Sequence, residues 1–307
     1  MKSLRREAPV KKLIIVFVMI ALILLVGSVF TTVYAQDAAK DDTPTFYHLT
    51  PGTYVNGWPR FTVHYPKDWV QALAMTQEVF RAVPPGNTGD VFAILVYANR
   101  QPLDKVVDAV AGYFKGAGVK DLTVVKDKPT QLSNGTPARE VEIRGIWNGS
   151  PFSFACLCVK HGDLWIQPEV SSQSARIGEH LAAILYSLQY KPSKDEPVKV
   201  PADVQEFLDG QCRDLLSHDL AKVMTRFSDK FLNLGVRKGE VERTVRSWIG
   251  SVTSCEVRVT DFIAEGDRAY LAGFNIGGWG KAPLLGTSII KESGEWKWYG
   301  NQRDVVP

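Results

Sequence analysis

The spacing of apolar and polar residues divides the chain into parts. Between residues 61 and 190, apolar positions mostly alternate or run together as in β-strands, with helical spacing at 103–114 and 177–188. Turn residues such as Asn148-Gly149 join consecutive strands and make the sheet antiparallel. The predicted strands cover residues 61–65, 91–97, 122–125, 137–146, 150–159 and 164–166.

The strand at 150–159 predicts the layers of this part. One of its faces carries two phenylalanines and two cysteines, and the other carries Ala155, Leu157 and Val159. Because both faces are apolar, both must be covered by other elements. With one helix before this strand and one after it, the pattern predicts an antiparallel-sheet α/β/α sandwich.

The remainder of the chain begins with helical spacing and ends with strands. Helices are predicted at 204–215, 220–227 and 238–249, followed by strands at 255–263, 268–276, 284–291 and 296–301. Helices followed by a meander of strands predict an α+β cone, in which a curved sheet wraps around helices. The expected fold class of the whole chain is therefore α+β.

The amino terminus has a third pattern. Five Lys and Arg residues precede an uncharged, mostly apolar run at 13–30, and small or aliphatic residues occupy the first and third places of Val33-Tyr34-Ala35. The pattern is typical of a signal peptide at 1–35, although this 18-residue run is also just long enough for an uncleaved membrane anchor. The body is expected outside the cytoplasm in either case: secreted or periplasmic after cleavage near Ala35, or anchored by residues 13–30.

Polar stretches give the expected domain limits. Residues 36–44 are rich in Asp and Lys and predict a spacer, and residues 191–199 predict a linker. The two expected domains therefore cover residues 45–190 and 200–307.

The net charge of +3 belongs to the amino-terminal segment. Residues 36–307 carry 31 Lys and Arg against 32 Asp and Glu. A nearly neutral body excludes nucleic acid as an electrostatic partner. Membrane contact is expected only through the amino-terminal segment, if it stays uncleaved.

The four cysteines and the histidines allow few chemical sites. Cys212, on a helical apolar stripe, and Cys255, at the start of a strand, either form a disulfide or stay as two buried thiols. Cys156, Cys158 and His161 are spaced like part of a metal site, but core packing is favoured because His161 has the opposite strand parity and a fourth ligand is not visible. No nucleophile elbow, P-loop or dinucleotide motif occurs. We therefore expect no catalytic residue, metal or cofactor.

Aromatic residues are dense in the second domain. They predict either a pocket for a small apolar ligand or, as the favoured alternative, a packed cone or a homodimer face. Trp279 lies between glycines and is a candidate for contact with a partner. The candidate pocket residues are Trp248, Arg258, Tyr270, Phe274, Asn275, Trp296 and Trp298.

The first domain resembles the PsbP-like family, which includes photosystem II extrinsic subunits and a Ran-binding protein. The resemblance rests on FTVHYPKDW at 61–69, NGTPARE at 134–140 and ILYSL at 184–188, within residues 45–190. It implies the same α/β/α sandwich and mostly protein-binding roles. It transfers no catalytic residue.

The second domain resembles the nuclear transport factor 2-like superfamily, which includes ketosteroid isomerase and SnoaL-type cyclases. The resemblance rests on His218-Asp219-Leu220, Phe227-Ser228-Asp229 and GEWKWYG at 294–300. It implies a fold that encloses a pocket between helices and sheet. At the positions of the isomerase's tyrosine and general base, ungapped counting finds Gln211 and Gly235, so the sequence departs from the isomerase pattern.

Together these features predict a non-enzymatic, extracytoplasmic module that binds a protein partner in the cell envelope. A homodimer through the second domain is also expected to be feasible. The alternative is an enzyme or a small apolar ligand carrier that uses the second domain's pocket, which a buried, strongly shifted titratable group in that pocket would favour.

Overall fold

The computed structural model describes residues 51–302 apart from 76, 87, 191, 193–195, 279 and 285–287. The predicted signal peptide or anchor, its cleavage position near Ala35, the spacer at 36–44 and Trp279 lie outside the described residues. No helix within the described ranges is both long enough and apolar enough to cross a bilayer. Helices occur together with sheets whose named strands all pair antiparallel, which confirms the α+β class.

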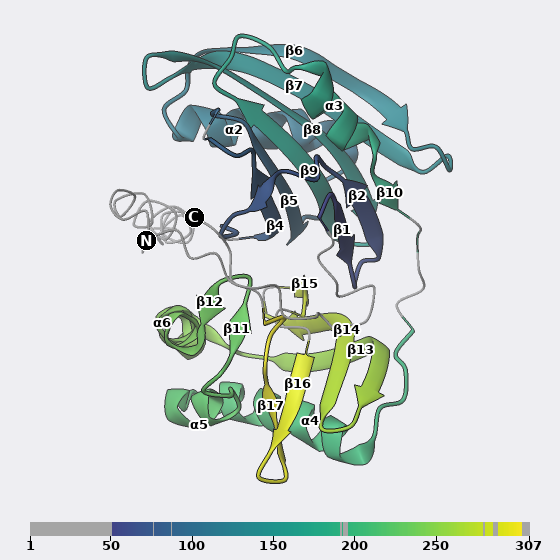
Figure 1. Ribbon diagram of the computed structural model, residues 1–307, viewed down its shortest axis with the longest axis vertical. Helices are drawn as coiled ribbons and strands as arrows, with labels where there is room; N and C mark the ends of the chain where they lie inside the picture. Colours follow the sequence, from purple (N-terminus) through teal and green to yellow (C-terminus); the bar gives the residue numbers. More distant parts are fainter. Residues whose placement is uncertain are drawn as a thin grey trace, which may run out of the picture. The chain divides into compact units, whose positions relative to one another are not determined.

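A seven-stranded sheet forms the centre of the first half, in the order β3-β4-β5-β9-β8-β7-β6 (Figure 1). Strands β7, β8 and β9 are consecutive hairpins, in which the pair Trp147–Ser150 flanks the predicted turn Asn148-Gly149 and the pair His161–Leu164 flanks the second turn. The strands are β3 (Val70–Gln71), β4 (Glu78–Val83), β5 (Val91–Ala98), β6 (Lys120–Gln131), β7 (Pro137–Trp147), β8 (Ser150–His161) and β9 (Leu164–Ser172).

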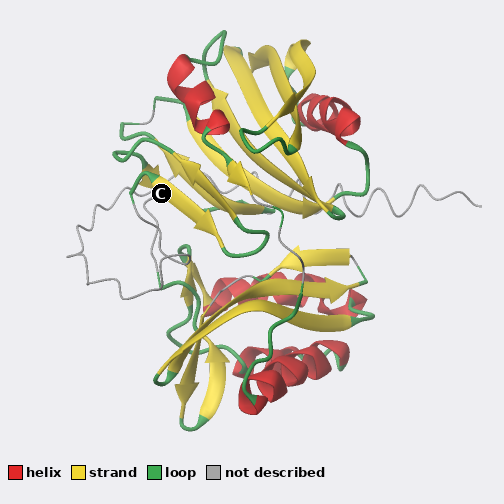
Figure 2. Ribbon diagram, turned by 90° about the vertical axis from the view of Figure 1, so that its right-hand side faces the viewer, coloured by secondary structure: helices red, strands yellow, loops and turns green. Residues whose placement is uncertain are grey.

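Both faces of this sheet are covered, as strand β8 predicts. On one face, Phe114 of helix α2 (Val106–Gly116) packs in a cluster with Phe154 and Cys156; a short 3-10 turn, η2 (Leu103–Lys105), precedes this helix. On the opposite face Leu157 packs in a cluster with Leu181 of helix α3 (Glu179–Tyr186). Figure 2 shows the two helices on opposite sides of the sheet.

A smaller three-stranded sheet packs in the same cluster as α3. Its order is β1-β2-β10, and strand β2 supplies Phe61 and Val63 to the buried core. The side chain of Ser187 accepts from the His64 backbone N–H at 2.8 Å, which ties the end of α3 to β2. The strands are β1 (Thr53–Asn56), β2 (Phe61–His64) and β10 (Gln189–Tyr190).

The second half has the predicted order of helices before strands. Asp219 caps the second helix, since its carboxylate accepts from the Lys222 N–H at 3.1 Å. The helices are α4 (Ala202–Leu216), α5 (Leu220–Thr225) and α6 (Lys238–Trp248), with a short 3-10 turn η3 (Ile249–Ser251); a two-stranded ribbon of β11 (Leu232–Asn233) and β12 (Val236–Arg237) lies between α5 and α6 in the sequence.

The sheet of the second half has five described strands instead of the predicted four. Strand β14 continues to Gly277 and a further strand begins at Gly280, so both ends of the glycine-rich segment 277–280 belong to strands. The order is β13-β14-β16-β17, with β15 paired to β14. The strands are β13 (Cys255–Glu265), β14 (Arg268–Gly277), β15 (Gly280–Pro283), β16 (Ser288–Glu292) and β17 (Glu295–Trp298).

Strand β14 is buried on both faces. Leu271 packs in a cluster with Phe207 of α4. On the other face, Tyr270 and Phe274 belong to the large core cluster that also contains Trp58 of the first half. One of the hydrophobic clusters is therefore shared by the two halves of the described chain.

Candidate functional site

The structure does not bring the seven predicted pocket residues together. Tyr270 and Phe274 are buried on one face of β14, with the Phe274 ring 4.4 Å from the ring of Trp58. Trp296 and Trp298 pack in the cluster on the α4 face, where the Trp298 ring lies 5.2 Å from Phe207. Core side chains therefore fill both places where the predicted pocket would have its aromatic walls.

The remaining three pocket candidates lie elsewhere. Trp248 ends α6 and packs in a separate small cluster with Val245 and Val252. Arg258 is exposed and pairs with Glu256 at 2.5 Å, and Asn275 is half-buried on β14. The seven residues thus divide among three clusters and the surface.

The cysteines adopt two states. Cys212 and Cys255 form a disulfide that joins α4 to the first strand of its sheet, with Cα atoms 5.2 Å apart. Cys156 and Cys158 are free and buried, and burial raises the pKa of both thiols, so they stay protonated. His161 makes its contact elsewhere, with its Nδ1 2.8 Å from the Tyr190 hydroxyl. No group of three or more metal-ligating side chains occurs within the described residues.

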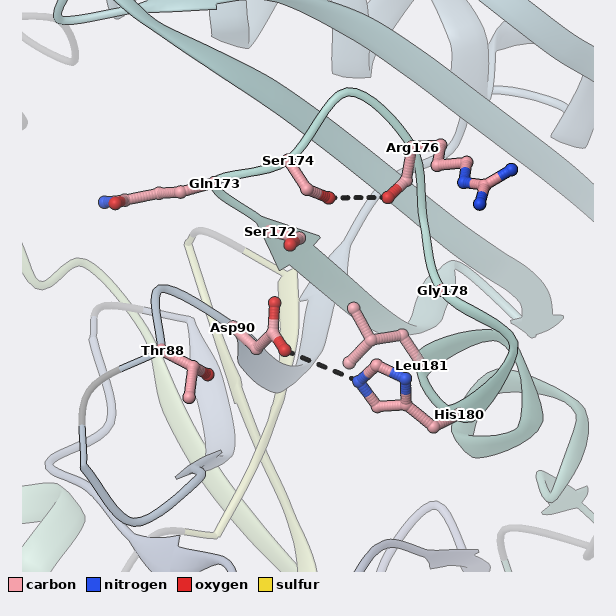
Figure 3. Close-up of a pocket in the computed structure, with 9 residues that line it drawn as sticks. All are labelled: Thr88, Asp90, Ser172, Gln173, Ser174, Arg176, Gly178, His180 and Leu181. Carbon is pink, nitrogen blue, oxygen red and sulfur yellow. Dashed lines mark hydrogen bonds and ion pairs between the residues drawn. The ribbon is translucent and has the colours of Figure 1, made fainter.

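An open surface hollow of about 390 Å³ lies where the β4–β5 connection meets the segment between β9 and α3. Asp90 and His180 contact each other there at 3.4 Å, and the Ser174 hydroxyl donates to the Arg176 carbonyl at 2.6 Å (Figure 3). Figure 3 shows the side chains of Gln173 and Arg176 extending away from Asp90 and His180. The hollow thus has polar walls, but its longest side chains do not converge on a common point.

A second candidate is a set of polar side chains on the α2 face of the seven-stranded sheet, which we call the polar cluster. The sheet register places Arg81 opposite Ala93, and Ala93 opposite Glu169, on three neighbouring strands. Helix α2 packs over β6, β7 and β8, so the polar cluster occupies the part of this face next to the helix. Its members are Glu78 and Arg81 of β4, Tyr97 of β5, and Gln167 and Glu169 of β9.

Hydrogen bonds connect part of the polar cluster in a chain. The Tyr97 hydroxyl donates to Gln167 Oε1 at 3.0 Å, and Gln167 Nε2 donates to Glu169 Oε2 at 2.8 Å. Gln167 is only 4% exposed, so its amide orientation is fixed by these two bonds. Glu169 is therefore held in place by a buried neighbour.

The other part of the polar cluster is an ion pair. Arg81 donates from Nε to Glu78 Oε2 at 2.8 Å and from Nη2 to Glu78 Oε1 at 2.5 Å. The side chain of Glu78 is 5% exposed and also accepts from the Met75 backbone N–H at 2.8 Å. Two-point pairing of this kind satisfies both oxygens of the carboxylate.

The surroundings of Glu169 change the pKa of its carboxyl group. Burial raises the pKa of Glu169 to about 8, the nearby Glu78 carboxylate adds to the rise, and Gln167 and Arg81 oppose it. The pKa of Tyr97 is also raised, first by burial. Near neutral pH the carboxyl of Glu169 is therefore mostly protonated.

Three exposed side chains, which we call the apolar rim, include two next to the polar cluster: Met75, whose backbone N–H donates to Glu78, and Tyr113, whose pKa responds to the charges of Glu169 and Glu78. Leu73 and Met75 come from the segment before β4 and are 50% and 52% exposed. Tyr113 of α2 is 59% exposed, and its pKa is raised by burial and by the charges of Glu169 and Glu78. Apolar surface beside half-buried polar groups is a common feature of protein-binding sites.

Sequence reasoning missed the polar cluster, although a signal for it was present. In the run from Leu164 to Val170, Gln167 and Glu169 share the parity of Trp165. Polar residues at that parity indicate a change along one strand face from apolar core to a polar patch.

No protein-family model matches the chain, and no curated protein sequence matches it. Among solved structures, the cyanobacterial PsbP of Synechocystis is similar, with a TM-score of 0.37, 11% identity, and coverage of 45% of this chain and 91% of that one. The Ran-binding protein Mog1p of Saccharomyces cerevisiae is similar with a TM-score of 0.34 and 8% identity, and the match covers 42% of this chain and 89% of that one. A protein of Bacteroides thetaiotaomicron is similar with a TM-score of 0.34 and 11% identity, and the match covers 83% of this chain and 90% of that one.

Structures of the PsbP kind are thus among the structural neighbours for part of this chain. At these identities and scores, the likeness says nothing about activity or partners. The nuclear transport factor 2-like resemblance of residues 200–307 stays a prediction.

Proposed function

We propose that the protein is an extracytoplasmic binding module that docks a protein partner over the polar cluster and its apolar rim. The observation that carries the proposal is the exposure of Met75 and Tyr113 next to the polar cluster, with Leu73 exposed two residues before Met75. Side chains of this kind contribute most to the free energy of binding when a partner excludes water from them. The location outside the cytoplasm rests on the sequence of residues 1–35 alone.

We infer that the module is built from an α/β/α sandwich at 45–190 and an α+β cone at 200–307. The positions of α2 and α3 on opposite sheet faces support the sandwich. The packing of α4 against β13 and β17 supports the cone. The alternative of a ligand carrier or enzyme in the cone loses support, because Phe274 and Trp298 are packed among core side chains.

Site-specific photocrosslinking in the host tests the docking surface. A photoreactive phenylalanine derivative replaces Tyr113 on α2 or, as the matched control, Tyr186 on α3, which is 56% exposed on the other side of the sheet. We expect a discrete adduct with an envelope protein from position 113 and none from position 186. The adduct should weaken when Leu73→Ser and Met75→Ser remove apolar area from the rim.

Three results would contradict the existence of this docking surface, and a fourth would change the partner. They are the absence of any adduct from position 113, the same adducts from both positions, and an adduct that persists unchanged in the rim variants. An adduct from position 113 with a second copy of this chain would identify a homodimer through the first half, and it would overturn docking of a different protein.

A further inference from the structure

The two glutamates of the polar cluster differ in what neutralises them. Glu78 accepts from Arg81 at both carboxylate oxygens, through Nε and Nη2 of the guanidinium. Glu169 accepts one hydrogen bond, from the Gln167 amide, and within the described part of the chain it forms no ion pair. A half-buried carboxylate without a cation is unfavourable, because burial removes water that would otherwise stabilise the charge.

The groups that face Glu169 do not supply the missing positive charge. Across the sheet, Cys156 of β8 lies opposite Glu169, and burial keeps this thiol protonated. Tyr97 of β5 and Tyr113 of α2 have raised pKa values and are uncharged at neutral pH. From β4 come Arg81, whose charge lowers the pKa of Glu169, and Glu78, whose charge raises it, and these two side chains are paired with each other. The site therefore lacks one positive charge whenever Glu169 is ionised.

The geometry points to Glu169 as the acceptor for a basic side chain, Lys or Arg, of the protein partner. This inference rests on the proposed function and specifies the chemistry of the partner. A Lys or Arg side chain has an apolar stem and a charged head. The stem would pack along Met75 and Tyr113 of the apolar rim, and the head would pair with the carboxylate of Glu169 in the half-buried site.

Such binding must be linked to the release of a proton. Because the pKa of Glu169 is about 8 in the free protein, about 1% of this group is ionised at pH 6 and about 90% at pH 9. A cation that pairs only with the carboxylate should therefore bind about ninety-fold more tightly at pH 9 than at pH 6.

The test uses n-butylammonium as a probe, since it has the shape and charge of a lysine side chain and stays cationic over this pH range. The full chain in mild detergent carries 15N in its glutamine side-chain amides, so that Gln167 Nε2 reports on Glu169 by NMR. We expect a saturable shift of the Gln167 signal whose apparent affinity rises at least tenfold from pH 6 to pH 9. Neutral n-butanol should give no such shift.

Two variants make the result specific to Glu169. Glu169→Gln keeps the shape and can still accept from Gln167, but it cannot ionise, so the saturable shift should disappear. Glu295→Gln, at an exposed strand position, is the matched control and should behave as the wild type. A shift that does not saturate, that persists in Glu169→Gln or that is independent of pH would overturn the inference.

These results are separable from those of the crosslinking experiment. An adduct from position 113 without specific binding of n-butylammonium leaves the docking surface in place and overturns the role of Glu169. Specific binding of n-butylammonium without any adduct overturns the docking proposal instead, and with it the assignment of the cation to a protein partner.

Discussion

Replacing Glu169 with Gln should change how the stability of the protein depends on pH. The pKa of Glu169 is raised by folding from 4.5 to about 8, so the folded state holds this proton more tightly than the unfolded state does. The contribution of the protonated carboxyl to stability is complete below about pH 4.5 and is lost as the pH rises towards 8. Gln cannot titrate, so the variant should not lose this contribution.

The size of the effect follows from the shift. One pKa unit corresponds to about 1.4 kcal/mol, so a rise from 4.5 to about 8 gives an upper limit of roughly 5 kcal/mol. Because Glu169 is half-buried and keeps some contact with water, we expect roughly 2–3 kcal/mol. The free energy of unfolding of Glu169→Gln, relative to the wild type, should rise by this amount between pH 5 and pH 9.

Urea denaturation of both proteins at pH 5, 6, 7, 8 and 9, followed by circular dichroism, measures this difference. Other groups titrate equally in the two proteins, so subtracting the two curves isolates Glu169. The control Glu295→Gln should give a flat difference. If the curves of Glu169→Gln and wild type are parallel, or diverge towards low pH, the reasoning about this carboxyl is refuted.

Three further predictions concern stability in urea. Cys212→Ser with Cys255→Ser opens a cross-link of sequence separation 43 and should cost about 4 kcal/mol, whereas reductant should lower the stability of the wild type only. Trp58→Ala and Phe274→Ala should each lower the free energy of unfolding by roughly 3–5 kcal/mol. A double-mutant cycle should give a coupling energy of about 1 kcal/mol between them, and a coupling of zero would contradict the contact between the two rings. Gly112→Ala, at an exposed helical position with open space around it, should stabilise by about 0.5–1 kcal/mol; a loss would contradict this description of α2.

Local alternation was enough to predict that both faces of β8 are covered. In β8, the parity of Phe154 and Leu157 correctly assigned each to a different covered face. Strand β4 was missed because its register is irregular between Glu78 and Phe80, so that Val79 and Phe80 are both buried in the same cluster. A bulge of this kind removes the alternation on which strand prediction depends.

The residues of the candidate pocket are separated for a different reason. Trp296 and Trp298 lie two residues apart on β17, and both pack in the cluster on the α4 face. Sequence spacing cannot show that the face of β14 bearing Tyr270 and Phe274 packs with the first half instead. The element that packs on each face of a strand is determined by contacts between residues far apart in the chain. The polar cluster could not be predicted for the same reason, because its residues come from three strands, β4, β5 and β9.

The shared core also bears on how such a chain can be altered by recombination. The stripe of Tyr270, Ala272 and Phe274 is buried in a cluster whose other members come mainly from the first half. If the second half were transplanted onto an unrelated domain, this stripe would be exposed to water and would favour aggregation. We expect homologous proteins either to keep both halves or to have polar residues at these positions. Where both halves are kept, residues 58 and 274 should covary, because their rings are in contact.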